Sequence, residues 1–396
     1  MFFQLDDTEL FFPDPNLAED DGLLAIGGDL SPQRLVNAYA SGIFPWFSEG
    51  EPLLWWSLDP RMVLFPDDFR CSKSLHRTIL SHKFEVRIDT AFRQVMESCG
   101  RTPRPDQDGT WITQEMIEAY VRLHELGLAH SFETYKEGEL IGGLYGVSLG
   151  DLFFGESMFH TVTDASKVAF ARLVEYCNLH GFRLIDAQQP TPHLASLGAK
   201  PIPRKEYLSL LEATDWSRTM QGHWNHNTVV LLIGGNQGDR QQLITEATHL
   251  IGERIGTVRL SSSLYETEPW GFEAEQDFLN QALVVDTTLP SEEVLHTALD
   301  IEHQLGRLRP FIDPEHKHYV SRPMDIDLIF YNSLVCDTPE LQLPHPRMHL
   351  RRFVLQPLAD IIPHFRHPKL HKSIRQLLAE CPDTQKVMQF HSTSDM

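Results

Sequence analysis

Hydrophobic residues recur along the chain in short runs whose spacing predicts alternating helices and strands. In the first part, helical spacing covers residues 73–81, 90–98, 113–127 and 165–180, and strand spacing covers 129–136, 139–149, 152–155 and 182–186. Residues 1–65 are rich in proline, glycine and tryptophan, and we expect them to be irregular. A mixed sheet packed against a long helix is typical of the α+β class.

A polar stretch between Asp215 and Asn227 interrupts this periodicity and separates a second part of the chain. The second part reads as strand 228–233, helix 239–252, strands 258–266 and 280–288, helix 291–306 and strand 324–330. This βαββαβ order is typical of a ferredoxin-like domain. We therefore expect a small domain over residues 1–65, a second domain over 66–217, a linker over 218–227 and a third domain over 228–392.

The length of the chain indicates how many domains it has, and its charge limits what it can bind. A chain of 396 residues is too long for one ordinary core, so two or three domains are expected. The formal net charge is −21, and residues 1–222 contain 19 basic and 32 acidic side chains against 15 and 23 in the remainder. Neither part is as basic as a general nucleic-acid binder, so any RNA contact is expected to be local.

The five cysteines are scattered and show no C-x-x-C spacing, which fits a reducing cytoplasm and argues against structural zinc or disulfides. The first residues turn acidic at once, so we expect no signal peptide. No apolar run approaches the ~18 residues that span a membrane. We therefore expect a cytoplasmic protein without a membrane partner.

Asp325 and Asp327 are the most informative pair of residues in the sequence. Side chains alternate across a strand, so residues two apart share a face, while Ile326 and Leu328 face a core. Two neighbouring carboxylates suit Mg²⁺, which proteins often share with nucleotide phosphates. Arg322 lies just upstream and could reach phosphate oxygens. The alternative interpretation is a polar edge strand with solvated charges.

Other motifs surround this pair in a fixed order. A glycine-rich turn over residues 234–240 follows a strand, and then come Y-x-T-x-P-x-G from residue 265, F-L-N from 278, G-R-x-R from 306, R-x-x-D-x-D from 322 and H-P-R from 345. This set resembles the 6-hydroxymethyl-7,8-dihydropterin pyrophosphokinases of folate biosynthesis. Gly235 departs from the pattern, because this family often has serine there.

The resemblance implies transfer of the β,γ-pyrophosphoryl group of ATP to the pterin hydroxymethyl oxygen, with release of AMP. It assigns four groups of residues: Mg²⁺ ligands Asp325 and Asp327; catalytic arginines Arg307 and Arg322; pterin contacts Thr267, Phe278, Asn280 and Phe353; and ATP contacts Glu302, Arg309, His345 and Arg351. Such a reaction depends mainly on positioning and electrostatics. Without the resemblance, the two phenylalanines would be interpreted as core residues.

A second set of motifs occupies the first part of the chain. These are G-I-F-P-W from residue 42, W-W-S-x-D-P-R from 55, G-T-W-I-T from 109, L-F-F-G-E-S-M-F from 152 and L-I-D-A-Q from 184. Aromatic residues beside Pro and Gly turns indicate a rigid apolar pocket, to which Glu156 and the Asp186/Gln188 pair add polar groups. This set resembles the leucyl/phenylalanyl-tRNA–protein transferases.

The transferase resemblance implies a small N-terminal domain followed by a GNAT-like α/β domain. The implied reaction moves leucine, phenylalanine or methionine from aminoacyl-tRNA to proteins that begin with Arg or Lys, marking them for degradation through the N-degron pathway without a cofactor. Gln188 would contact the attacking amine, Asp186 would favour its loss of a proton, and Glu156 would position the reacting groups. The aminoacyl side chain would lie against Trp46, Trp111, Phe153, Met158, Phe170 and Ile185.

Together the two resemblances predict a bifunctional enzyme. The rival hypothesis is that one half has lost catalysis and serves as a binding or structural module. A third hypothesis, general RNA binding, conflicts with the acidic balance of both halves.

Overall fold

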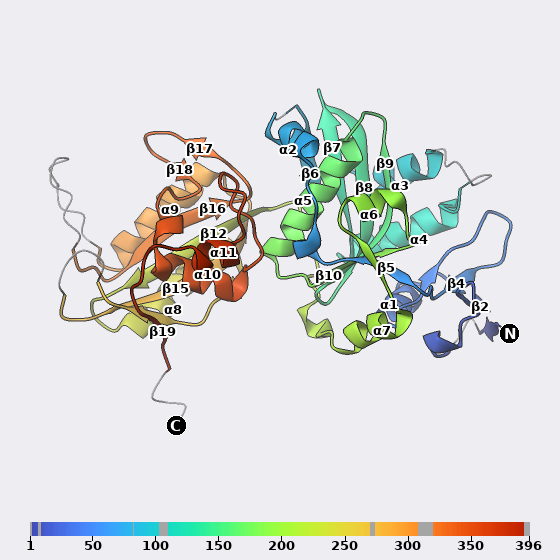
Figure 1. Ribbon diagram of the computed structural model, residues 1–396, viewed down its shortest axis with the longest axis horizontal. Coiled ribbons are helices and arrows are strands. Elements are labelled where there is room, and N and C mark those ends of the chain that lie inside the picture. Colours follow the sequence, from blue (N-terminus) through green and yellow to red (C-terminus); the bar gives the residue numbers. More distant parts are fainter. Residues whose placement is uncertain are drawn as a thin grey trace. The chain divides into compact units, whose positions relative to one another are not determined.

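The computed structural model describes residues 2–6, 9–81, 83–102, 110–269, 274–307 and 320–391. The chain forms two compact units, which are coloured along the sequence in Figure 1. Unit 1 comprises Met1–Cys177 and Phe182–Asn225, and unit 2 comprises Asn178–Gly181 and His226–Met396.

The N-terminal region of unit 1 contains a small sheet and a helix joined by long loops, so the expectation of irregular structure over residues 1–65 was wrong for these elements. It contains a four-stranded sheet in the order β1-β2-β4-β3, formed by β1 (Phe3–Leu5), β2 (Leu23–Gly27), β4 (Leu54–Trp56) and β3 (Phe44–Pro45). Helix α1 (Pro32–Ala40) begins after Ser31, whose side chain accepts a hydrogen bond from the backbone of Arg34. These strands have only two to five residues, too few to produce a visible period.

A seven-stranded sheet forms the centre of unit 1, in the order β11-β5-β10-β9-β8-β7-β6. Neighbouring strands are antiparallel except β9 and β10, which run parallel. The strands are β5 (Arg61–Leu64), β6 (Glu85–Ile88), β7 (Ala129–Lys136), β8 (Glu139–Leu149), β9 (Leu152–His160), β10 (Leu184–Gln188) and β11 (Lys200–Ile202). The predicted strands at 129–136, 139–149, 152–155 and 182–186 are therefore confirmed.

Helices cover both faces of this sheet. The predicted helices are confirmed within a few residues as α2 (Lys73–Leu80), α3 (Phe92–Arg101), α4 (Gln114–Glu125) and α5 (Ala165–Leu179). Side chains of α3 and α4 share a core with Tyr145, Val147 and Phe154, whereas α5 packs with Leu144 and Phe153 on the opposite face. The shorter helices α6 (Pro192–Ser196) and α7 (Arg204–Glu212) follow β10 and β11.

The polar segment predicted as a linker over 218–227 is divided between the units. Its residues up to Asn225 belong to unit 1, where Trp224 is only 1% exposed. The Trp224 indole stacks on His130 at 3.6 Å and on Tyr176 at 4.4 Å between ring centroids. The Trp224 amide donates to the Asp89 carboxylate at 2.7 Å.

Unit 2 is built on an antiparallel sheet in the order β16-β12-β15-β14-β19, with β13 also paired to β15. The strands are β12 (Asn227–Gly235), β13 (Thr257–Ser261), β14 (Tyr265–Thr267), β15 (Phe278–Thr287), β16 (Asp325–Tyr331) and β19 (Val387–Gln389). Helices α8 (Arg240–Arg254) and α9 (Ser291–Gln304) pack on one face. Helices α10 (Arg352–Ile361) and α11 (Ile374–Ala379) pack on the other.

Strand β12 shows why both faces of this sheet are covered. Val229, Leu231 and Ile233 are buried toward α8 and α9, while Val230 and Leu232 are buried toward α10 and α11. An uninterrupted apolar run is typical of a strand with helices on both sides. The short hairpin of β17 (Cys336–Asp337) and β18 (Gln342–Leu343) lies outside this sheet.

The whole chain is a mixed α+β protein, as predicted. No helix in the described ranges combines the length and the apolar character that crossing a bilayer requires.

Candidate functional sites

Unit 1 contains a cavity of about 470 Å³. Its walls come from the N-terminal region, the central sheet and α5, and they include all six residues predicted to hold an aminoacyl side chain: Trp46, Trp111, Phe153, Met158, Phe170 and Ile185. Glu156, Asp186 and Gln188 line the same cavity. The structure therefore brings these residues together, and their roles stay a prediction.

The position of the polar residues follows from the pairing of two strands. The parallel pairing of β9 with β10 ends at Phe154 and Asp186. Glu156 and Gln188 follow two residues later, one in each strand. Gln188 has a φ of +58°, a left-handed conformation that non-glycine residues rarely adopt and that often marks a functional position. Both residues thus lie just beyond the point where β9 and β10 pair, and both line the cavity.

Asp186 is held by an ion pair inside the protein. The Arg61 guanidinium donates from Nε to Oδ1 at 2.9 Å and from Nη2 to Oδ2 at 2.7 Å, and both side chains are 1% exposed. The Tyr207 hydroxyl donates to Oδ2 at 2.8 Å, and the Gln188 backbone donates to Oδ1 at 2.9 Å. Four hydrogen bonds therefore surround this carboxylate.

Glu156 lies in a different environment. Its Oε1 accepts from the Tyr39 hydroxyl and from Gln188 Nε2, both at 2.7 Å, and its Oε2 accepts from the Tyr120 hydroxyl at 3.3 Å. Burial raises the pKa of Glu156 to about 7, although hydrogen bonds from Tyr39 and Gln188 oppose this shift. Glu156 can therefore change protonation state near neutral pH.

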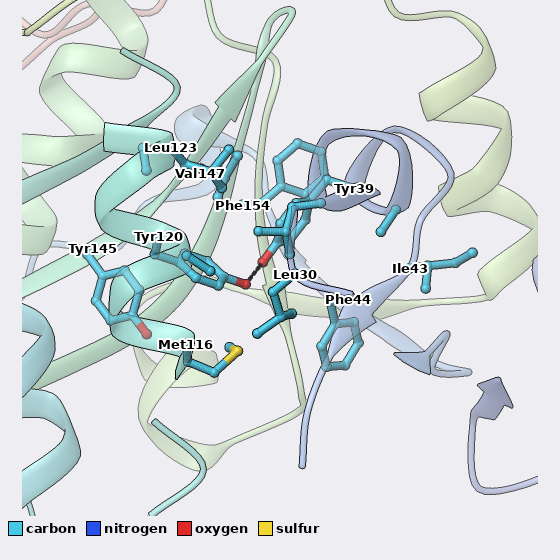
Figure 2. Packing of buried hydrophobic residues seen from close by; sticks show 14 of the residues in the cluster. Leu30, Tyr39, Ile43, Phe44, Met116, Tyr120, Leu123, Tyr145, Val147 and Phe154 are labelled. Atoms are coloured by element: carbon cyan, nitrogen blue, oxygen red, sulfur yellow. Dashed lines mark hydrogen bonds between the residues drawn. The ribbon is translucent and has the colours of Figure 1, made fainter. Parts of the chain in front are cut away.

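Tyr39 and Tyr120 hold Glu156 from the core side. Figure 2 shows the two hydroxyl groups meeting, where they form a hydrogen bond to each other. Tyr39 comes from α1 and Tyr120 from α4, and both side chains are fully buried. Burial raises the pKa of both phenols well above the usual value, and the nearby Glu156 charge adds to this effect. Both phenols are therefore neutral. Because each has only one hydroxyl hydrogen, the shorter contact with Oε1 favours Tyr39 as the donor to Glu156, with Tyr120 donating to Tyr39.

The sequence patterns indicated no role for Tyr39, Tyr120, Arg61 or Tyr207. Arg61 stands in the quoted W-W-S-x-D-P-R motif, so a signal was present, but its partner lies 125 positions further along the chain. The two site tyrosines follow ordinary amphipathic helix patterns and gave no separate signal.

In unit 2, Asp325 and Asp327 lie on one face of β16, as the alternation predicted. Ile326 and Leu328 are buried on the opposite face, in the core with α8 and α9. The guanidinium groups of Arg307 and Arg322 both form ion pairs with Asp325. The structure therefore brings the two aspartates and both predicted catalytic arginines together.

The two aspartates differ in protonation. Burial disfavours ionisation of Asp325, but the charges of Arg322 and Arg307 outweigh it and hold its pKa below the usual value. Burial and the Asp325 charge together raise the pKa of Asp327 to about 7. Two adjacent acids with oxygen donors on one face form a donor set that suits a hard cation, which would favour ionisation of both. The residues present therefore fit the predicted Mg²⁺.

Glu302 lies behind this pair. Its side chain, 2% exposed, accepts at Oε1 from Arg307 Nη1 at 2.7 Å and from the Ile326 backbone at 2.8 Å. The structure thus places this predicted ATP contact as a partner of Arg307. Glu302 orients the arginine that reaches Asp325.

The predicted pterin contacts come from three elements. Asn280 on β15 donates from Nδ2 to the Thr267 hydroxyl on β14 at 3.1 Å. Phe278 is buried on the same strand, and the Arg322 guanidinium lies 5.0 Å from its ring centroid. Phe353 belongs to α10, and the Arg351 guanidinium lies 5.6 Å from its ring centroid. Each aromatic ring thus has a cation beside it.

His345 and Arg309 complete the predicted ATP contacts. Burial, with the charges of Arg351 and Arg347, lowers the pKa of His345 to about 4, so its imidazole is neutral at neutral pH. The His345 backbone donates to the Ile329 carbonyl at 3.0 Å, which ties it to β16. Arg309 lies outside the described residues.

Asn236 lies in the glycine-rich turn and was not among the predicted site residues. Its Oδ1 accepts from the Arg322 backbone at 2.9 Å, its backbone donates to the Arg322 carbonyl at 2.9 Å, and its Nδ2 donates to the Ser321 hydroxyl at 3.0 Å. Gly235 permits this approach, because a Cβ there would lie 2.0 Å from the Pro323 carbonyl oxygen. The turn therefore fixes the backbone that carries Arg322.

Family models match both units. The model for leucyl/phenylalanyl-tRNA protein transferase matches residues 63–212, and the model for the N-terminal domain of that family matches residues 28–59. The model for 7,8-dihydro-6-hydroxymethylpterin-pyrophosphokinase (HPPK) matches residues 230–363.

Solved structures give a weaker likeness. The chain is 18% identical to a crystal structure of HPPK-DHPS from Plasmodium falciparum with pteroate, with a TM-score of 0.32, over 39% of this chain and 42% of that one. The aligned part therefore spans less than half of that protein.

Close relatives match the first unit. The chain is 56% identical to the leucyl/phenylalanyl-tRNA–protein transferase of Desulfatibacillum aliphaticivorans over 214 residues, which cover 54% of this chain and 92% of that relative. It is 55% identical to the enzyme of the same name from Myxococcus xanthus over 219 residues, or 94% of that relative. Through this part, the chain belongs to the leucyl/phenylalanyl-tRNA–protein transferase family.

Proposed function

We propose that unit 1 transfers leucine, phenylalanine or methionine from aminoacyl-tRNA to the N-terminal Arg or Lys of proteins, as in the N-degron pathway. The observation that carries this proposal is the cavity, whose apolar and aromatic walls end at Glu156 and Gln188. An apolar side chain without a branch at Cβ fits such walls, while the polar end lies where an amine can meet the ester. The family membership of the chain supports the same conclusion.

The test follows radiolabelled leucine from Leu-tRNA onto a peptide with N-terminal arginine, using the full chain. We expect transfer to this peptide and none to the same peptide with N-terminal alanine. Absence of transfer to both peptides, from a folded sample, contradicts the proposal.

A second proposal concerns unit 2: transfer of pyrophosphate from ATP to 6-hydroxymethyl-7,8-dihydropterin in folate biosynthesis. The match to the HPPK family model supports it, together with the cluster of Asp325, Asp327, Arg307 and Arg322. Asp325 and Asp327 would hold Mg²⁺, which neutralises part of the triphosphate charge when bound. The arginines would leave Asp325 for the phosphate oxygens, for which their planar groups are well suited.

In this proposal the pterin lies near Phe278 and Phe353, with its amide edge against Asn280 and Thr267. His345, Arg351 and Arg309 contact ATP, and Glu302 acts through Arg307. The test measures AMP released from ATP by the full chain, with pterin and Mg²⁺ added together or singly. We expect AMP only when both are present, and AMP formation without pterin contradicts the proposal.

The finer fold assignments belong to the same proposals. A GNAT-like fold for the large sheet of unit 1 and a ferredoxin-like fold for unit 2 follow from the two resemblances. The cytoplasmic location expected from the sequence stays a prediction.

A further inference from the structure

Two acidic residues approach Gln188 from different sides of the cavity in unit 1. Asp186 accepts from the Gln188 backbone at 2.9 Å, and Glu156 accepts from the Gln188 side chain at 2.7 Å. A proton must leave the attacking amine during peptide-bond formation, so either acid is a candidate acceptor. The hydrogen bonds and ion pairs around each carboxylate show which of the two is the better proton acceptor.

Asp186 is poorly suited to accept a proton. The bidentate Arg61 ion pair balances its charge, and Arg61, Tyr207 and Gln188 together donate four hydrogen bonds to its two oxygens. Protonation would break this arrangement and leave the buried Arg61 without a counter-charge, which is costly. Its hydrogen bond to the Gln188 backbone also holds that residue at its positive φ.

Glu156 is suited to this role. Its hydrogen-bond partners are the Tyr39 and Tyr120 hydroxyls and the Gln188 amide, all neutral, so no ion pair fixes its charge. The charged groups that act on it are Asp186 and Arg61, which are paired with each other. Its Oε1 accepts two hydrogen bonds at 2.7 Å, whereas among the described residues Oε2 has only the 3.3 Å contact with Tyr120, which leaves Oε2 with more capacity to accept a proton. Burial also places its pKa near the working pH of a cell.

We propose that Glu156 accepts the proton of the attacking amine, with Tyr39 and Tyr120 as the residues that position its carboxylate, while Asp186, Arg61 and Tyr207 position Gln188 and take no proton. This inference rests on the transferase function proposed for unit 1. It differs from the sequence-based expectation that Asp186 favours loss of the proton.

The step balances within the two substrates and this side chain. The amine nitrogen bonds to the ester carbonyl carbon and loses a proton to Glu156. The bond from that carbon to the ribose oxygen then breaks, and the ribose oxygen leaves with the proton from Glu156. Because Gln188 Nε2 donates to Glu156, its Oε1 remains to accept from the amine and align it.

The test is the pH dependence of kcat for leucine transfer, measured with saturating substrates. A base acts when ionised, so we expect the wild-type rate to rise with pH through about 7 and then level off. Glu156→Gln should lower kcat about 10²- to 10⁴-fold and remove this rise. Tyr39→Phe removes a donor from the carboxylate, so the rise should move up by about one pH unit.

Asp186→Asn should keep the rise and move it to lower pH, because the Asp186 charge contributes to the raised pKa of Glu156. Tyr207→Phe removes one donor from Asp186 with less risk to folding, and should also keep the rise. Tyr135→Phe changes a buried tyrosine outside the cavity and is the matched control, with an unchanged profile.

Infrared spectroscopy tests the same carboxyl group without turnover. The spectrum of Glu156→Gln is subtracted from that of wild type, and the carboxylic-acid band of Glu156 should disappear as the pH is raised through about 7. An undiminished kcat in Glu156→Gln overturns the inference, as does a rise at about pH 7 lost in Asp186→Asn with folding intact. A rise at about pH 8 comes from the peptide's own α-amine, and its midpoint is located in a separate titration of the free peptide. Absence of wild-type transfer at every pH instead contradicts the function proposed for unit 1.

Discussion

Arg61 and Asp186 form a bidentate ion pair with both side chains removed from water. Desolvating two charges is expensive, and the geometry must be nearly ideal to offset that cost. Here the two parallel hydrogen bonds are supplemented by Tyr207, and the Arg61 guanidinium also lies 4.6 Å from the Phe44 ring centroid. The pair links β5 to β10 at the edge of the cavity.

Removing one partner should destabilise unit 1 strongly. We expect Arg61→Met to lower the free energy of unfolding by about 3–5 kcal/mol, because Asp186 would remain buried without a counter-charge. Urea denaturation followed by tryptophan fluorescence measures this, since most tryptophans lie in unit 1. The double variant Arg61→Met/Asp186→Asn should recover part of the loss. A single variant as stable as wild type would show that the pair contributes little.

In unit 2, the single residue whose replacement should matter most for the position of Arg322 is Gly235. Serine there would place its Cβ 2.0 Å from the Pro323 carbonyl oxygen, so the turn and the Arg322 segment would have to separate. We expect Gly235→Ser to lower AMP formation at least tenfold and to cost about 1–3 kcal/mol of stability, a typical cost of overpacking. Gly252→Ser is the control, because its Cβ position is open. Full activity of Gly235→Ser would contradict this account of the turn.

Single residues were predictable from the sequence where local geometry determines their position. Alternation along a strand was enough to place Asp325 and Asp327 on one face, opposite the buried Ile326. The partnership of Arg61 with Asp186 was not predictable, because it depends on how β5 and β10 pair. The roles given to Glu156 and Gln188 came from the family resemblance, and only the structure showed that a hydrogen bond joins them.

At the scale of elements, the polar segment that ends at Asn225 is part of the core of unit 1. It is polar in composition and lacks periodicity, which led to the prediction of a linker. A single large side chain, Trp224, nevertheless fills a core position between His130, Tyr176 and Phe182. Phe153, which lines the cavity, lies 6.2 Å from Trp224 between ring centroids. The segment therefore completes the core behind the cavity.

Trp224→Ala should reveal this contribution. Removing a fully buried tryptophan leaves a cavity, and we expect a loss of about 3–5 kcal/mol in unfolding free energy. Trp216→Ala, which truncates a partly buried tryptophan nearby, should cost clearly less. Thermal unfolding of both variants in the full chain provides the comparison. Equal effects of the two substitutions would mean that Trp224 is not a core element.

Elements with a long hydrophobic period were predicted well, whereas the two- to five-residue strands β1 to β4 were missed. The helices over 113–127 and 165–180 have enough turns for an apolar face to be visible, and α4 and α5 confirm them. The predicted strand 258–266 proved to be β13 and β14, separated at Ser262, whose backbone and hydroxyl both bond to Ala282. Such an interruption depends on the partner strand β15, which the local sequence does not specify.

At the scale of the whole molecule, each unit has its own core and its own candidate site. The cavity residues of unit 1 and the aspartates of unit 2 are separated in sequence, and the two proposed reactions share no substrate. Nothing in the chemistry requires an intermediate to pass from one site to the other. The joining of the two units is therefore expected to leave each activity independent.

Independence can be tested with one substitution in each unit of the full chain. Glu156→Gln should abolish most leucine transfer and leave AMP formation within about twofold of wild type, because its contacts with Tyr39, Tyr120 and Gln188 all lie in unit 1. Asp325→Asn should have the opposite effect, since it weakens both the Mg²⁺ site and the arginine pairs. Both activities are measured on one preparation of each variant, with thermal unfolding as a check on folding. If either folded variant lost both activities, the two sites would be energetically coupled, and the proton transfer proposed for Glu156 would need to be measured with the unit 2 substrates bound.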